Sequence, residues 1–256
     1  MVKGLDRFKD HFQAFADRYV LIGGTACDLI LSNAGMTFRA TKDLDIVLCV
    51  ESLDAAFGAA FWQFVTQGQY ELQEASTGQR KFYRFKRPKV DGYPSMLELF
   101  ARVPDAMVIK PGSELTPIPI DDAVSSLSAI LLDADYYSWI QTGKHQLGGL
   151  PVLRAEYLIA LKAKAWLDLR RRAAEGQRID SNDIKKHRND VFRLYAVVDP
   201  EFSTLPGAKI RSDLREFLSE VASDPPDLKS LGLPNATLRG VSELFGRVFQ
   251  LGNGER

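Results

Sequence analysis

Cysteine and histidine are scarce in this sequence, and their scarcity excludes several classes of site. The 256 residues include two cysteines, Cys27 and Cys49, and three scattered histidines, His11, His145 and His187. A disulfide framework needs several spaced cysteines, and a structural zinc site needs four closely spaced ligands. Neither is expected here. Both cysteines lie in apolar segments and are predicted to be small buried residues.

An excess of one charge and a long apolar run are also missing. Thirty-three basic and 33 acidic residues give a formal net charge of zero, which argues against nucleic-acid binding through overall charge. No apolar run approaches the ~18 residues of a membrane-spanning helix. The N-terminus lacks the apolar core of a secretory signal. A cytoplasmic protein with no membrane partner is therefore expected.

The most informative segment combines a strand, two glycines, a helix and a second strand. Tyr19–Ile22 is predicted to be a strand, and the helix is expected over Ala26–Leu31. Between them stand Gly23, Gly24 and Thr25. Backbone N–H groups at a glycine-opened helix N-terminus favour phosphate. A double glycine alone is more often a simple tight turn.

The following strand carries Asp43 and Asp45, separated by Leu44. Side chains alternate faces along a strand, so both aspartates lie on one face, about 7 Å apart. Leu44 and Ile46 point the other way, into a core. One such pair is commonly a solvated strand end. Beside a helix that opens with glycines, however, two carboxylates on one face favour Mg²⁺-assisted phosphoryl or nucleotidyl transfer.

A third carboxylate stands in an apolar run. Glu98 is the only charge within Met96–Phe100, a pattern typical of a strand buried on both faces. Burying an unpaired carboxylate is costly, so Glu98 should be paired, hydrogen-bonded or metal-bound. We therefore expect Asp43, Asp45 and Glu98 to form a cage for two metal ions.

These residues resemble those of a known superfamily. The Gly-Gly-Thr segment, followed by T-x-D-x-D from Thr41 and a later acid on a strand, is similar to the polymerase β-like nucleotidyltransferases. Towards the C-terminus the chain resembles the AbiEii toxin group of type IV toxin–antitoxin systems. The similar segments are Leu158–Ala165, which contains Lys162, and Lys186–Val191, which contains Asp190. His187 stands where that family has an aspartate.

The resemblance implies an α/β fold with a mixed nucleotidyltransferase sheet and a mainly helical C-terminal region. We expect the core over residues 1–118 and the helical region over residues 119–256. The implied reaction moves a nucleoside monophosphate from an NTP to an acceptor, RNA such as tRNA or a protein, and releases pyrophosphate. It would use two Mg²⁺ ions, with Gly23, Gly24, Thr25 and Thr41 at the nucleotide. A cognate antitoxin is the implied partner.

The helical wheel singles out Lys162 independently of the resemblance. On a helix over residues 154–172, Lys162 lies in the middle of an apolar face, near Leu158 and Trp166. A lysine there either extends its amine to the surface or meets an anion. Contact with a triphosphate is the favoured reading. Lys164 is expected towards the polar side of the same helix.

Asp190 falls on a second helix, over residues 182–198, with Ser181 or Asp180 as its N-cap. Asp190 either orients Lys162 or the acceptor, or forms a surface pair with Lys186. His187 is commonly a satisfied core histidine at such a position.

The basic clusters of the sequence do not decide what kind of molecule the acceptor is. Cations alternate with aromatic residues over Arg80–Lys89, and Arg170–Arg172 ends the lysine-bearing helix. Such clusters are usually solvated faces, but they would also suit an RNA acceptor. Two other functions compete: an aminoglycoside-type small-molecule nucleotidyltransferase, and a non-catalytic domain that binds nucleotide or a partner.

Overall fold

The computed structural model describes residues 2–49, 55–77, 80–100 and 133–252. The chain divides into two compact units, each made of two separate segments. The first unit is Met1–Asp121 with Lys144–Arg154, and the second is Asp122–Gly143 with Ala155–Arg256. The predicted boundary between residues 118 and 119 lies outside the described residues.

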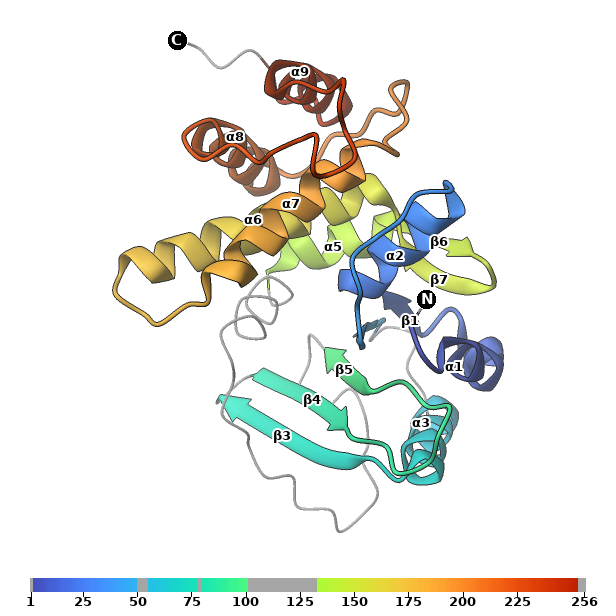
Figure 1. Cartoon of the computed structure of the whole chain (residues 1–256). Coiled ribbons are helices and arrows are strands. Elements are labelled where there is room, and N and C mark those ends of the chain that lie inside the picture. The colour runs from blue at the N-terminus through green and yellow to red at the C-terminus, as the bar shows by residue number, and fades with distance from the viewer. Residues whose placement is uncertain (1, 50–54, 78–79, 101–132, 253–256) are drawn as a thin grey trace. The chain divides into compact units, whose positions relative to one another are not determined.

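A seven-stranded mixed sheet forms the first unit, in the order β3-β4-β5-β2-β1-β7-β6 (Figure 1). Strand β2 pairs in parallel with β5, and β1 with β7, while all other neighbours are antiparallel. The predicted α/β class with a mixed sheet is confirmed. The strands are β1 (Tyr19–Leu21), β2 (Asp43–Leu48), β3 (Glu71–Thr77), β4 (Arg80–Lys86), β5 (Met96–Phe100), β6 (Lys144–Leu147) and β7 (Leu150–Leu153).

Aromatic packing covers one face of this sheet. Helix α1 (Leu5–Phe12), followed by the 3-10 turn η1 (Gln13–Phe15), packs against α3 (Ala55–Gly68) through Phe12 and Phe61, whose rings lie 5.9 Å apart. Phe61 also contacts the Phe85 ring of β4 at 5.4 Å. Because faces alternate along a strand, the residues on either side of Phe85 point to the opposite face. That opposite face carries the charged residues.

Helix α2 (Gly23–Asn33) begins three residues before the predicted start at Ala26. The Ala26 N–H donates to the Ile22 carbonyl at 3.3 Å, so the two glycines and Thr25 form the first helical turn instead of a separate loop. Gly23 adopts a φ of 65°, a left-handed conformation that glycine tolerates readily. The glycines therefore present the N-terminus of the helix directly after β1.

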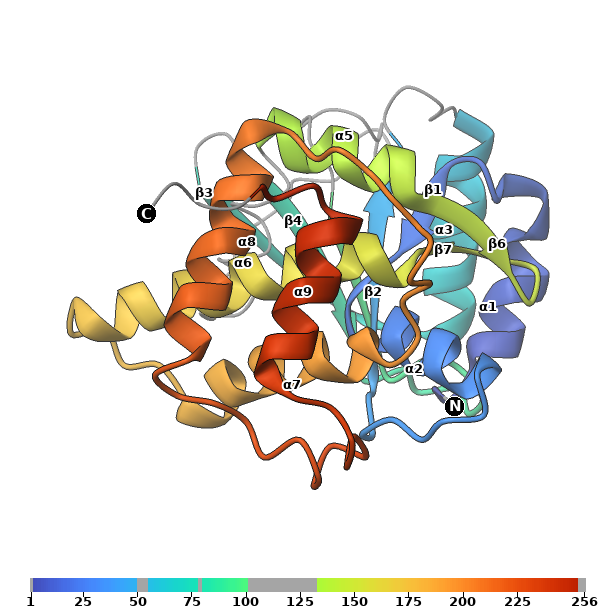
Figure 2. The same ribbon diagram turned by 90° about the horizontal axis from the view of Figure 1, so that it is seen from above.

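The second unit is helical in its described part, which confirms the predicted mainly α-helical C-terminal region. Residues 144–154, which fall inside the predicted range of 119–256, belong instead to the sheet unit and form β6 and β7. Trp166 and Phe217 pack edge to face in its core, with ring centroids 5.1 Å apart. Asp180 caps α7 as predicted, accepting from the Asn182 N–H at 2.8 Å. Figure 2 shows the helices from above. They are α5 (Ala134–Gly143), α6 (Ala155–Ala174), α7 (Ser181–Tyr195), α8 (Ala208–Val221) and α9 (Leu238–Val248).

No helix within the described parts of the chain combines the length and the apolar character needed to cross a bilayer.

Candidate functional site

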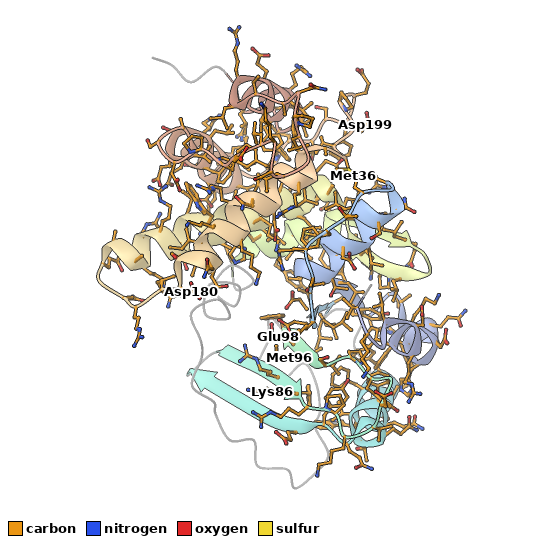
Figure 3. All side chains as sticks on the ribbon, viewed as in Figure 1. Met36, Lys86, Met96, Glu98, Asp180 and Asp199 are labelled. Atoms are coloured by element: carbon orange, nitrogen blue, oxygen red, sulfur yellow. The ribbon has the colours of Figure 1, made fainter. Side chains whose placement is uncertain are left out.

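Two rows of side chains cross the open face of the sheet in register. In one row Arg84, Glu98 and Asp45 lie directly opposite one another on β4, β5 and β2. In the next row, two residues along each strand, Lys86 pairs with Met96 and Met96 with Asp43. Figure 3 labels Lys86, Met96 and Glu98 on these neighbouring strands. The sheet therefore brings Asp43, Asp45 and Glu98 onto one face.

Arg84 holds the Glu98 carboxylate. Its Nε and Nη2 both lie 2.7 Å from Glu98 Oε1, and the two side chains are 13% and 9% exposed. Burial raises the pKa of Glu98 well above its ordinary value, and the neighbouring Asp45 raises it further. The Arg84 guanidinium opposes both effects without cancelling them. Glu98 is thus a protonatable carboxyl group shared between an arginine and an aspartate.

The first turn of α2 packs against the two aspartates. A Cβ at Gly23 would lie 1.6 Å from Asp45 Oδ2, so only glycine leaves room for that carboxylate. The Thr25 hydroxyl donates to the Asp43 carbonyl at 2.6 Å. A Cβ at Gly24 would approach Thr41 Oγ1 at 2.5 Å. Gly23, Gly24, Thr25 and Thr41 thus lie around the Asp43–Asp45 pair.

This arrangement suits one divalent cation at Asp43 and Asp45. Both side chains are partly exposed on one strand face, and carboxylate oxygens are the ligands that Mg²⁺ prefers. Across the part of the chain that the structure describes, no three His, Cys, Asp or Glu side chains converge as ligands of one ion. Arg84 contacts only Oε1 of Glu98, and the three-carboxylate cage stays a prediction.

In the second unit, Lys162 and Asp190 meet each other. Lys162 is 5% exposed within the buried face of α6, as the helical wheel predicts. Its Nζ lies 3.0 Å from Asp190 Oδ2 on α7. Arg193 Nη1 approaches the other oxygen of Asp190 at 3.5 Å. Of the alternatives for Asp190, the structure shows the pair with Lys162, whereas Lys186 lies 3.9 Å from Asp183.

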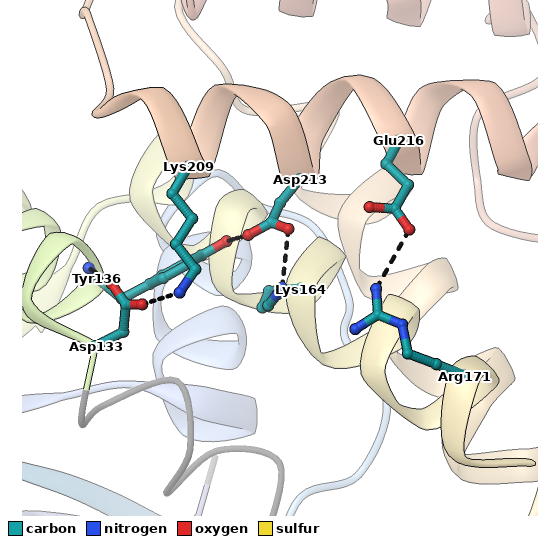
Figure 4. Close-up of polar contacts among 7 residues, drawn as sticks. All are labelled: Asp133, Tyr136, Lys164, Arg171, Lys209, Asp213 and Glu216. Carbon is teal, nitrogen blue, oxygen red and sulfur yellow. Dashed lines mark hydrogen bonds and ion pairs between the residues drawn. The ribbon is translucent and has the colours of Figure 1, made fainter. Parts of the chain in front are cut away.

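Lys164 lies on the less buried side of α6, where its side chain is 18% exposed and meets an aspartate of α8. Its Nζ contacts Asp213 Oδ1 at 2.8 Å, and Tyr136 donates its hydroxyl to the other oxygen of Asp213 at 2.9 Å (Figure 4). Asp213 is 6% exposed and Tyr136 is fully buried. The wheel of α6 could not show this contact, because α8 covers the side of α6 that Lys164 occupies. Lys164 therefore joins α6 to α8.

Arg84 is the site residue that the sequence did not single out. It lies within the basic, aromatic-rich segment that suggested a solvated or RNA-binding face. The spacing of Arg84, Phe85 and Lys86 holds the missing signal, since alternation with a buried phenylalanine puts both cations on one face. Their register against Glu98 is non-local and could not be read from the segment itself.

No protein-family model matches this sequence, and no curated protein matches it. The solved structures that are similar to it include a nucleotidyltransferase-like protein and a polyadenylate synthase. One is an antigenic nucleotidyltransferase-like protein from Paracoccidioides brasiliensis, with 17% identity, a TM-score of 0.39, and coverage of 96% of this chain and 99% of that one. The other is the Megavirus polyadenylate synthase, with 12% identity, a TM-score of 0.40, and coverage of 86% of this chain and 36% of that one.

Proposed function

We propose that this protein is a Mg²⁺-dependent nucleotidyltransferase that moves a nucleoside monophosphate from an NTP to a hydroxyl-bearing acceptor. The supporting observation is the packing of the first turn of α2 against the Asp43–Asp45 pair. Gly23 leaves space for the Asp45 carboxylate, and Thr25 bonds the Asp43 carbonyl. A helix N-terminus that attracts phosphate is thereby fixed beside two carboxylates that attract a divalent cation.

Each residue has a distinct task in this reaction. Asp43 and Asp45 would hold Mg²⁺, which supplies charge neutralisation at the phosphates and favours ionisation of the acceptor hydroxyl. The N–H groups of Gly23, Gly24 and Thr25 bind the phosphate oxygens. Thr41 packs against Gly24. Glu98 would complete the ligands of a second ion through the oxygen that Arg84 does not contact. The acceptor hydroxyl releases its proton to solvent and its oxygen bonds to the α-phosphate, while the bond between the α-phosphate and the bridging oxygen breaks and pyrophosphate leaves.

Lys162 and Asp190 complete the proposed machinery. Lys162 neutralises charge on the triphosphate, and Asp190 orients its ammonium through the 3.0 Å contact. A biological role as the toxin of a toxin–antitoxin or abortive-infection system follows from the sequence resemblance to the AbiEii group. Its acceptor would then be RNA or protein, and a cognate antitoxin would be its partner.

The direct test is incubation with each α-³²P-labelled NTP, Mg²⁺, and separate RNA, protein and aminoglycoside acceptors. We expect transfer of label that EDTA abolishes. Gly23→Ala should also abolish it, because the added Cβ collides with Asp45. Gly35→Ala is a matched control, since Gly35 also has a positive φ, of 73°, and a Cβ there meets nothing. Absence of transfer with every NTP and acceptor, together with Mg²⁺-independent NTP binding, would indicate a non-catalytic domain.

A further inference from the structure

A cavity of about 470 Å³ adjoins Asp43, at the end of the sheet where β4 leads into β5. Its walls include five cations and two carboxylates, in a chain whose formal net charge is zero. Positive charge is therefore concentrated at this position. The cations are Lys3, Lys42, Lys86, Arg87 and Lys89, and the carboxylates are Asp43 and Asp91.

Three of these cations are available to a ligand. Lys3 pairs with Asp91 at 2.5 Å, and Arg87 approaches Glu71 at 3.3 Å. Within the described residues, no ion pair engages the other three, which are Lys42, Lys86 and Lys89. Lys86 also lies on the face that carries Asp43, in the row that joins the two through Met96. The lysines without ion pairs thus extend from Lys89, in the β4–β5 connection, to Lys86, in the same row as the proposed metal ligand Asp43.

The wall that carries Lys89 is held in place. The N–H groups of Lys89 and Val90 donate to the Gly68 carbonyl at 3.1 and 3.3 Å. The Tyr70 hydroxyl donates to the Pro94 carbonyl at 2.6 Å, and Tyr93 packs on Phe64 with ring centroids 4.9 Å apart. A pre-formed wall lowers the entropy lost when a ligand binds. This arrangement differs from a solvated charged loop.

We propose that this cavity binds the phosphate backbone of a single-stranded nucleic-acid acceptor and brings one of its hydroxyl groups to Asp43. The inference rests on the proposed function, because it names the acceptor of that reaction. Lysine side chains contact phosphates without reading sequence. A cavity of this size has room for the end of a strand. An aminoglycoside carries several ammonium groups, which the same cations would repel.

The test compares two double variants that each lose two positive charges. Lys86→Gln/Lys89→Gln alters the cavity, and Lys185→Gln/Lys229→Gln removes exposed lysines of the second unit. Binding of a short fluorescein-labelled oligoribonucleotide, and of its DNA counterpart, is followed by anisotropy over a range of salt concentrations. The Asp45→Asn background without added metal removes turnover from the measurement.

The cavity variant should bind the oligonucleotide on the order of twenty-fold more weakly near 0.1 M salt, since each single-strand phosphate contact contributes about 0.7 to the salt slope. The slope itself should fall by about 1.4. The control variant should change neither quantity, and binding of a fluorescent ATP analogue should be unchanged in both. Equal affinity for RNA and DNA is expected if only phosphates are contacted.

Several results would overturn the inference. They are equal loss of affinity in the two double variants, an unchanged salt slope, and weaker ATP-analogue binding with oligonucleotide binding intact, which would assign the cavity to the triphosphate. Failure of the proposed function gives a different pattern. Cavity-dependent oligonucleotide binding with no transfer by the unmodified protein refutes catalysis alone. Transfer to an oligonucleotide with unchanged KM in the cavity variant refutes the acceptor site alone.

Discussion

Both units bury charged side chains, but the two sets of charges differ in how they are balanced. In the helical unit, Lys162 meets Asp190, and Lys164 meets Asp213. On the sheet face of the first unit, Arg84 pairs with Glu98, and Asp45 lies next to Glu98 in the same row. Buried charges that are balanced within the chain hold helices together. The neighbouring carboxylates Glu98 and Asp45 share one row with a single guanidinium, which favours binding of a cation from outside, so the sheet face is the better candidate for catalysis.

The largest expected effect tests the sheet face. Asp45→Asn keeps the side-chain volume and removes a proposed metal ligand. We expect transfer to fall by roughly three orders of magnitude, or ~4 kcal/mol of transition-state stabilisation. The melting temperature should be unchanged or higher, because the substitution removes one of several neighbouring carboxylates and so relieves their mutual repulsion.

The matched control is Asp10→Asn, which removes an exposed carboxylate from the same unit. A melting curve and a transfer assay on each variant decide the result. Full activity in Asp45→Asn would refute the assignment of Asp45 to the metal.

The next effect tests the helical unit. Lys162→Met leaves Asp190 fully buried and without its nearest cation, so the free energy of unfolding should fall by about 3–5 kcal/mol. The apolar face of α6 alone would suggest that this substitution is neutral. The pair with Asp190 instead makes it destabilising. Adding Asp190→Asn should restore part of the stability, because it removes the unpaired charge.

Nucleotide binding separates the structural role of Lys162 from its proposed contact with triphosphate. If that contact exists, Lys162→Met should also weaken NTP binding by about 1.5–3 kcal/mol. Lys185→Met, on the exposed side of α7, is the control for loss of charge. NTP binding that is equally weak in both variants would place Lys162 away from the nucleotide.

A pH titration sharpens the difference at Glu98. Its pKa is raised in the folded protein, chiefly by burial and then by Asp45, so the folded state favours the protonated carboxyl. The resulting stabilisation is present below the ordinary glutamate pKa and is lost as the pH rises through the folded-state pKa. Glu98→Gln cannot ionise, so in EDTA it should be more stable than the unmodified protein at neutral pH and lose this pH dependence.

The same variant should transfer label about 100-fold more slowly and need more Mg²⁺, if Glu98 is a metal ligand. Chemical denaturation at several pH values and a Mg²⁺ titration test the two statements separately. Lost stability at neutral pH with an unchanged Mg²⁺ requirement would make Glu98 a structural residue.

The smallest effect concerns the buried network of Figure 4. Tyr136→Phe removes the hydroxyl that donates to Asp213 at 2.9 Å and leaves Lys164 in place. The free energy of unfolding should fall by about 1.5–3 kcal/mol, the range for a hydrogen bond to a charged group, with transfer activity intact. Tyr137→Phe, on the same helix, is a comparison variant. Lost transfer at full stability would show that this network serves the active site.

Strand and helix periodicity predicted the positions of several site residues. The partners of other residues depend on contacts between segments far apart in the sequence. Strand alternation was enough to put Asp43 and Asp45 on one face, and a wheel was enough to bury Lys162. Neither pattern could find Arg84, because its role depends on the register of β4 against β5. The partner of Lys164 could not be found for a similar reason, since Asp213 lies 49 residues away on α8.

The strands β6 and β7 make the sheet unit discontinuous in the sequence. They return to the sheet after α5 has already begun the helical unit, and β7 pairs with β1. The chain therefore passes between the units three times, so no single cut separates one from the other. A fragment that ends before residue 144 would leave β1 as an open edge, a known route to aggregation. Recombination at one point likewise could not exchange the sheet unit intact, because its two segments are separated in the sequence.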